Sequence, residues 1–154
     1  MVRRVYNLTP HSIDICDEEL KKVKSIKPEG LVVRAKMEEE IWCTLSASEI
    51  PVWSIQVTDP TIEENPFAPR RIGTPIGKTE EIFIIVSRTA ADAILRRRTA
   101  NNPMWDYVGE GVKIINVLTV HKSQKDKDTG EYFDRETGER YGALGFALQG
   151  QVGR

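Results

Sequence analysis

One stretch decides the fold class, EIFIIVSRTAADAILRRR, residues 81–98. Residues 82–86 form a continuous apolar run of strand length, which is typical of a central strand buried on both faces. Good helix formers follow, and Thr89 with Asp92 three residues later resembles a capping box in which Asp replaces Glu. The final three arginines fall where cations oppose the negative end of a helix. We therefore predict a core strand, a tight turn and one short helix over residues 90–98.

Outward from this stretch, the chain reads mostly as short strands. Ile13 and Ile15 alternate with polar residues, which indicates a half-buried antiparallel strand over residues 12–16. Residues 17–27 fit either a charged hairpin or a short helix. Further strands are expected at residues 4–8, 31–37, 41–45, 52–57, 112–121 and 141–149. The predicted fold class is α+β, a strand-rich, mostly antiparallel sheet with one short helix after a central strand.

Two segments interrupt this pattern. Residues 59–81 hold four prolines and two glycines, which argue against a continuous helix or a central strand. Residues 122–140 hold two acidic-Thr-Gly-Glu motifs, whose glycines predict turns in an exposed hairpin. At 154 residues the chain has the size of one domain. We expect a single domain, residues 1–154, with a long loop at 59–81 and an exposed hairpin at 122–140.

The composition indicates a cytoplasmic protein that folds alone. Hydrophobic residues make up 40% of the chain, enough for a core, and no run of 18 apolar residues suggests a membrane span. The 22 basic and 23 acidic side chains leave a net charge of −1, so no overall field attracts nucleic acid or an anionic membrane. Two cysteines without paired spacing fit a reducing compartment.

Common catalytic and metal-binding patterns do not occur in the sequence. His11, His121, Cys16 and Cys43 share no spacing typical of a zinc site, and no serine lies in a G-x-S-x-G elbow. Residues 73–79, GTPIGKT, look like a phosphate-binding loop, but the spacing between the glycines is one residue short and a proline removes an amide donor. We predict no catalytic residue, metal site or cofactor from these patterns.

The start of the predicted helix offers a candidate site for an anion. There the amides of Arg88 and Thr89 and the Ser87 hydroxyl group would lie at the positive end of the helix dipole. Arg34 and one arginine of residues 96–98 would add charge, because a guanidinium group makes two bonds to phosphate oxygens. The alternative is ordinary capping of a short helix, in which these groups satisfy its first amides.

A second candidate is the turn NLTPH, residues 7–11. Pro10 fixes φ and lacks an N–H donor, so a turn or bulge between two strands is expected there. Such a turn would aim His11 outward, where an imidazole can exchange a proton near neutral pH. The alternative, which we favour, is a structural turn in which the side chains of Asn7 and Thr9 bind backbone groups.

The same NLTPH segment, followed by Ile13 and Ile15, resembles the opening of a family of small uncharacterised proteins of bacteriophages and bacteria. Further pieces are similar to that family in the same order, namely Pro28, Gly30, Val32 and Arg34, then residues 84–87 with an alanine-rich helix, then residues 142–146. The enlarged loop at 59–81 and the inserted hairpin at 122–140 depart from it. The resemblance implies a phage or prophage context, in which small proteins often act on host systems.

This context suggests three functions. The first is a binder of a small phosphate-bearing ligand such as a nucleotide signal. The residues expected to bind it are Ser87, Arg88, Thr89, Arg34, Asn7, Thr9 and His11. The second is a protein-interaction module that acts on a host protein. The third is a nucleotide-cleaving enzyme, because Thr9, His11 and the arginines can serve phosphodiester chemistry.

The three tryptophans and many short strands also suggest self-association. Unpaired strand edges invite pairing, and closed cyclic dimers are the commonest oligomers. Trp42 and Trp53 lie in strand-like segments and are expected in the core. We therefore predict a homo-oligomer. Trp105 lies in an expected loop and is either an anchor in the core or a residue of the interface.

Overall fold

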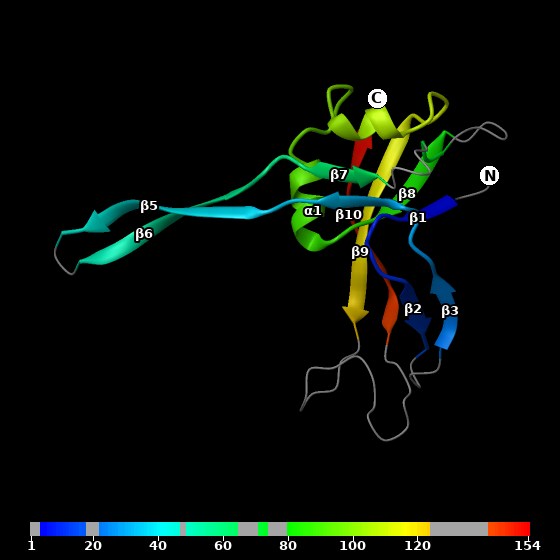
Figure 1. Ribbon diagram of the computed structural model, residues 1–154, viewed down its shortest axis with the longest axis horizontal. Coiled ribbons are helices and arrows are strands. Elements are labelled where there is room, and N and C mark those ends of the chain that lie inside the picture. Colours follow the sequence, from blue (N-terminus) through cyan, green and yellow to red (C-terminus); the bar gives the residue numbers. More distant parts are fainter. Residues whose placement is uncertain (1–3, 18–21, 47–48, 65–70, 74–79, 124–141) are drawn as a thin grey trace, which may run out of the picture.

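Figure 1 shows a body built around a mixed sheet, from which a long hairpin projects to one side. The computed structural model describes residues 4–17, 22–46, 49–64, 71–73, 80–123 and 142–154. Its strands are β1 (Arg4–Asn7), β2 (Ile13–Cys16), β3 (Lys22–Ile26), β4 (Leu31–Arg34), β5 (Met37–Leu45), β6 (Ile50–Val57), β7 (Thr61–Glu64), β8 (Glu81–Ile85), β9 (Ile114–Ser123) and β10 (Ala143–Gly153). Its helices are α1 (Arg88–Ile94) and the 3-10 helix η1 (Pro103–Tyr107).

The main sheet has six strands in the order β1-β8-β9-β10-β2-β3. Strand β8 pairs in parallel with both β1 and β9, while β10 pairs antiparallel with β9 and in parallel with β2. The α+β class and the mostly antiparallel pairing are therefore confirmed, but the main sheet is mixed. Its parallel pairs are β1 with β8, β8 with β9 and β10 with β2, because the chain returns to this sheet through long connections as well as hairpins.

The core lies on one face of this sheet, under α1, η1 and β4. Successive side chains of a strand point to opposite faces, so Ile82 and Ile84 of β8 enter this core together with Val86, which follows the strand. The helices contribute Ala90, Ala91, Ile94, Met104 and Trp105. Ile85 points the other way and is also fully buried. The prediction that Ile84, Ile85 and Val86 belong to the core is confirmed.

Helix α1 follows β8 as predicted, but its ends differ from the expected ones. It begins at Arg88 and ends at Ile94, and its N-cap is Ser87 rather than Thr89. The Ser87 hydroxyl oxygen accepts a hydrogen bond from the Ala90 amide at 3.2 Å. The predicted capping box at Thr89 was wrong, because Ser87 caps the helix two residues earlier. The last turn of α1 contains no basic residue, since the three arginines follow the helix.

The strand pairs of the structure decide the remaining local predictions. The hairpin alternative was right for residues 17–27 where they are described, because β3 pairs antiparallel with β2. The expected strand at residues 31–37 divides into β4 and the start of β5, and β7 within the expected loop at 59–81 pairs with β4. The expected hairpin at 122–140 lies almost wholly outside the described residues, and its first two residues belong to β9.

In the described part of the chain, β5 and β6 pair only with each other and form the projecting hairpin, which we call the arm (residues 37–46 and 49–57). Hydrogen bonds between its two flanking residues close its root, and a bond from Arg96 fastens the root to the body. Thr58 and Lys36 exchange hydrogen bonds, with the Thr58 amide donating to the Lys36 carbonyl at 2.8 Å and the Lys36 amide donating to the Thr58 hydroxyl oxygen at 2.9 Å. Arg96 donates to the Val57 carbonyl. The arm therefore leaves the body from a defined position beside the end of α1.

Candidate functional site

Three segments that carry predicted site residues meet at Leu8. The Leu8 amide donates to the Ile85 carbonyl at 2.9 Å, and the Leu8 carbonyl accepts from the Val33 amide at 3.1 Å. The residues that follow Leu8, Val33 and Ile85 therefore lie together at the edge of the sheet where the parallel strands β1 and β8 have their carboxyl ends. We call this place the Leu8 edge. Ligands of open sheets bind preferentially beyond such carboxyl ends. The fold thus brings the NLTPH turn, the end of β4 and the start of α1 together.

The side chain of Asn7 is used inside the protein. It is fully buried, and its Nδ2 group donates to the carbonyls of His11 at 2.8 Å and Ile26 at 3.1 Å. Its Oδ1 atom accepts from the Thr9 amide at 3.0 Å and the Thr9 hydroxyl at 2.6 Å. Asn7 therefore ties the β1–β2 turn to the end of β3, while the side chain of His11 is exposed. This geometry agrees with the structural alternative for the turn.

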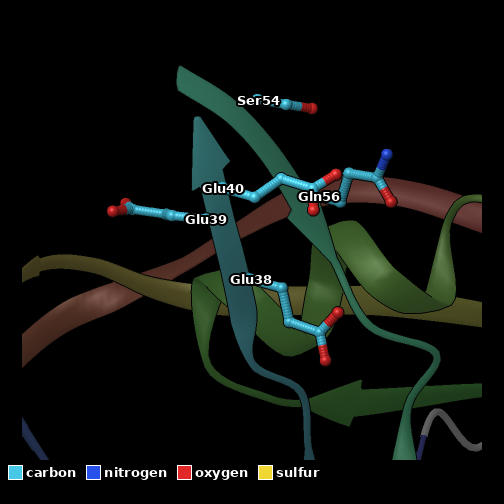
Figure 2. A pocket seen from close by; sticks show the side chains of 5 residues that line it. All are labelled: Glu38, Glu39, Glu40, Ser54 and Gln56. Atoms are coloured by element: carbon cyan, nitrogen blue, oxygen red, sulfur yellow. The ribbon is translucent and has the colours of Figure 1, made fainter. Parts of the chain in front are cut away.

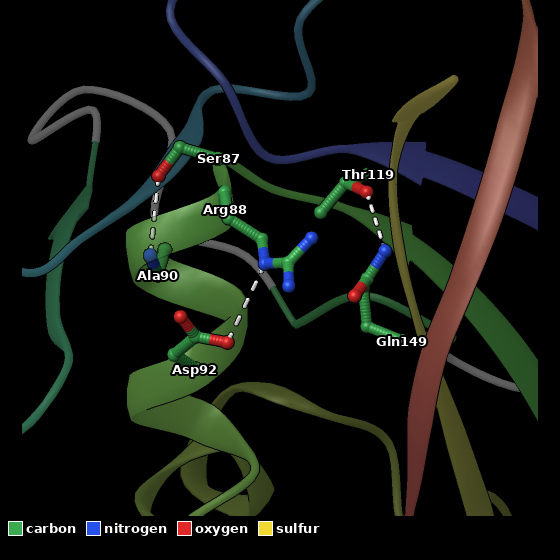
Figure 3. Close-up of polar contacts among 6 residues, drawn as sticks. All are labelled: Ser87, Arg88, Ala90, Asp92, Thr119 and Gln149. Carbon is green, nitrogen blue, oxygen red and sulfur yellow. Dashed lines mark hydrogen bonds and ion pairs between the residues drawn. The ribbon is translucent and has the colours of Figure 1, made fainter. Parts of the chain in front are cut away.

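The residues at the start of α1 also have partners within the chain (Figure 3). Ser87 caps the helix, and the Arg88 Nε atom lies 3.7 Å from an Asp92 carboxylate oxygen, with both side chains mostly exposed. Thr89 is half-buried. Arg34 pairs with Glu63 at 3.1 Å across β4 and β7. Exposed pairs of this kind contribute little stability, so Arg34 and Arg88 can exchange partners at small cost.

Two of the three arginines after α1 bind residues at the base of the arm, and the third binds the C-terminal end of the helix. Arg96 donates to the Val57 carbonyl, and an Arg97 Nη2 atom lies 3.5 Å from an Asp59 carboxylate oxygen. The Arg98 Nε group donates to the Leu95 carbonyl at 3.2 Å. Arg96 and Arg97 therefore fasten the base of the arm, and the structure does not bring these side chains to the Leu8 edge.

The arm carries the largest group of exposed apolar side chains among the described residues. Each of its seven large members is at least half exposed, and Trp42 reaches 75%. The members are Met37, Ile41, Trp42, Leu45, Ile50, Trp53 and Ile55. The prediction that Trp42 and Trp53 lie in the core was therefore wrong. Both were placed by their strand-like surroundings, which are real, but the strands that carry them have no covering layer.

The structure decides between the two alternatives for Trp105. It lies in η1 with only 7% of its surface exposed, and its indole Nε1 group donates to the Thr99 carbonyl at 3.0 Å. The guanidinium group of Arg154 stacks over its ring at 4.6 Å from the centroid. Trp105 is thus a core residue, so the core alternative is right and the interface alternative is wrong.

A bulge at Trp42 moves the apolar side chains from one face of the arm to the other. Cross-strand partners share a face, so Ile41 and Trp53 lie on one face near the root, together with Met37 and Ile55. The register shifts between Ile41 and Cys43. Beyond it the apolar pairs are Cys43 with Val52 and Leu45 with Ile50, which lie on the opposite face near the tip. We call these two groups the root face and the tip face.

The face opposite the root face is polar and acidic. Glu38, Glu40, Ser54 and Gln56 lie on it and, together with Glu39, line an open pocket at this end of the arm. Figure 2 shows Glu39 leaving β5 on the side opposite Glu38 and Glu40, which is the root face, where Glu39 is the cross-strand partner of Ile55. In the part of the chain that the structure describes, no group of three or more His, Cys, Asp or Glu side chains is placed to hold a metal ion. Glu38 and Glu40 therefore mark a solvated face, whereas Glu39 places one charge within the root face.

The arm was missed as a candidate site because its strands have the same composition as core strands. The one sequence signal was the run of three glutamates in an otherwise apolar strand, since adjacent charges rarely fit a buried strand. Comparisons with protein-family models, curated proteins and solved structures found no match. Among the described residues, no helix is both long and apolar enough to cross a membrane.

Proposed function

We propose that this protein is a protein-interaction module whose contact surface is the arm, residues 37–46 and 49–57. The observation that carries the proposal is the seven large apolar side chains that the arm leaves at least half exposed. Together they leave roughly 700 Å² of apolar surface in water, estimated from typical side-chain areas. This surface is divided between the two faces of the arm, and the largest exposed apolar patch of a soluble monomer, roughly 300–600 Å², is often a functional one.

The way the arm is built supports this proposal. An isolated two-stranded hairpin is at best marginally stable in water, and stability usually requires a third strand or a packed layer. Among the described residues the arm has neither, although its strands are 9 and 8 residues long. A partner that covers the root face would supply the missing layer. The bond from Arg96 to the Val57 carbonyl and the ion pair of Arg97 with Asp59 hold the base of the arm in position for that contact.

The test is an affinity capture with tagged protein and matched variants. Ile55→Lys places a charge in the root face, whereas Val23→Lys changes an apolar residue on β3 that is 68% exposed and lies outside the arm. We expect the parent and Val23→Lys proteins to retain the same partner at equal yield, and Ile55→Lys to lose it. Equal retention by Ile55→Lys would show that the arm is not the contact surface. The expected host partner would be identified by mass spectrometry of the eluted protein.

A second candidate function, binding of a small phosphate-bearing ligand, is favoured by the meeting of three segments at Leu8. Arg34, Arg88 and Thr9 come from these segments, and the two arginines are held only by exposed ion pairs. A phosphate would offer each guanidinium group a stronger, two-bond partner than the present carboxylate. Buried Asn7 would act through the turn that it holds rather than by touching the ligand.

Thermal-shift screening with nucleotides, including cyclic dinucleotides, tests this second candidate. A ligand present at about 100 times its Kd raises the free energy of unfolding by about 2.7 kcal/mol, which is readily seen as a higher melting temperature. We expect the shift to disappear in Arg88→Ala. Mass spectrometry of the recovered nucleotide separates sequestration, which returns it intact, from cleavage, which returns a product. If no nucleotide changes the melting temperature, both the binder and the nucleotide-cleaving enzyme are excluded for that set.

A further inference from the structure

The root face holds one carboxylate among its apolar side chains. Glu39 lies between Met37 and Ile41 on the same side of β5, because successive side chains of a strand alternate between its faces. Across the hairpin it pairs with Ile55, and Ile41 pairs with Trp53. Glu39 is exposed, and its carboxylate forms no ion pair with another residue that the structure describes. Any layer that covers these apolar neighbours therefore also covers Glu39.

This carboxylate sets a condition on the partner. A charge that is taken out of water without an opposite charge beside it is strongly destabilising, whereas a well-placed cation offsets the loss of hydration. Arginine fits this role best, since its planar guanidinium group makes two bonds to one carboxylate. A partner that covers the root face therefore needs a basic residue opposite Glu39, set among apolar side chains.

The charge of the whole hairpin selects the same kind of partner. Residues 37–57 contain four glutamates and no lysine, arginine or histidine, although the chain has 22 basic side chains in total. A surface of one sign attracts a partner of the opposite sign and repels nucleic acid and anionic membranes. A second arm, which also lacks a basic residue, cannot supply the cation for Glu39. The charge therefore favours a cationic segment of another protein.

The root face has the size of one short segment. It consists of three alternate cross-strand pairs, formed by residues 37–41 of β5 and 53–57 of β6. At about 3.3 Å per residue these strands extend over roughly 16 Å, and they lie about 4.8 Å apart. An α-helix about 10 Å wide covers that length with about 11 residues. One helix laid along the arm can therefore cover the root face with a single apolar stripe.

We propose that the partner of the arm is a basic amphipathic helix of another protein, whose central arginine or lysine binds the Glu39 carboxylate while its apolar side chains cover the root face. This inference rests on the proposed function, because it names the chemistry of the partner of the same surface. Glu39 then determines which segments bind. A helix with an apolar or acidic residue at the central position leaves the covered carboxylate without a partner, so it is rejected.

Selection from a displayed library of random peptides about 15 residues long, a length at which isolated helices begin to form, tests this chemistry. Peptides are selected for binding to the full chain and against binding to Ile55→Lys. We expect the selected peptides to share a basic residue within an apolar stripe of helical period. Glu39→Gln should bind the best peptide roughly tenfold more weakly or worse, because it removes one charge of a covered ion pair. Glu38→Gln is the matched control, since Glu38 is exposed on the opposite face, and its affinity should equal that of the parent.

An exchange of charges tests the direct contact. Glu39→Lys should lose the selected peptide and should instead bind the same peptide with its basic residue replaced by glutamate, whereas Glu38→Lys should keep the preference of the parent. Both positions are exposed, so an unchanged melting temperature is expected of either variant and checks its fold.

Two results overturn this inference and leave the arm as the contact surface. One is a set of selected peptides without a basic residue, and the other is equal affinity of the parent and Glu39→Gln for the best peptide. If no peptide binds the parent in preference to Ile55→Lys, the inference fails as well. Equal retention by Ile55→Lys in the affinity capture would then remove the proposed function too.

Discussion

Replacement of Asn7 by alanine should lower the free energy of unfolding more than the loss of so short a side chain would suggest. The Asn7 side chain is fully buried and makes four hydrogen bonds, two as donor to His11 and Ile26 carbonyls and two as acceptor from Thr9. A hydrogen bond contributes about 0.5–1.5 kcal/mol net, and buried groups left without partners add to the loss. We expect Asn7→Ala to lower the free energy of unfolding by about 3 kcal/mol.

Urea unfolding followed by circular dichroism measures this loss, with an unchanged dependence on urea as the check that unfolding stays two-state. For a domain of this size, each kcal/mol corresponds to roughly 2–4 °C in Tm, so a decrease of about 6–12 °C is expected as well. Asn101→Ala is the matched control, because Asn101 is exposed and its side chain only accepts a bond from the Thr99 hydroxyl. We expect that variant to unfold like the parent.

A stability of Asn7→Ala within about 1 kcal/mol of the parent would refute the structural account of the NLTPH turn. It would mean that the four bonds to Asn7 are replaced by water or by other groups. The role of Asn7 would then have to be sought in ligand binding. His11→Ala separates the two accounts further, since its exposed imidazole should affect ligand binding without changing the unfolding curve.

Three further substitutions probe the helix cap, a close backbone contact and the core. Ser87→Ala removes the cap of α1 and should cost about 1 kcal/mol in urea unfolding, and an unchanged curve would remove the capping role. Gly142→Ala brings a Cβ atom within 2.2 Å of a backbone oxygen and should lower the free energy of unfolding by about 1–3 kcal/mol. In Gly153→Ala the added Cβ atom meets nothing within 4 Å, so this control should be tolerated. Equal melting temperatures of the two variants would contradict the close contact at Gly142. Ile85→Asp should fail to fold or lose roughly 3 kcal/mol or more of its free energy of unfolding, because it buries a charge. Ile55→Asp, on the exposed arm, should keep the fold. An Ile85→Asp protein that melts like the parent would refute the place of Ile85 in the core.

Several local features were predictable because neighbouring residues decide them. The apolar run at residues 82–86 needs no distant information to become a strand, and the alanines after Ser87 favour a helix wherever they pack. The β2–β3 hairpin likewise joins segments that are adjacent in sequence. The place of the N-cap was missed by two residues, since Ser87 and Thr89 are both good caps and only the backbone path after β8 selects between them.

The parts of the candidate sites that depend on distant segments could not be read from the chain. The side chain of Asn7 has a hydrogen-bond partner inside the protein because the carbonyl of Ile26 in β3, 19 residues away, lies beside it. Arg34 comes close to the NLTPH turn only because β4 bonds to Leu8. A side-chain pattern states which residues share a face of a strand, but it does not state which strand lies beside it.

The sequence by itself determined that this chain forms short strands, one helix after a buried strand and a turn at NLTPH, because backbone preferences and alternation act over a few residues. Only the tertiary structure decided that β1, β8 and β9 run in parallel, that Trp105 is buried and that Trp42 and Trp53 are exposed. The physical reason is that burial depends on what covers a face. An apolar strand with a layer above it becomes core, and the same kind of strand in the arm, with none, becomes a surface for a partner.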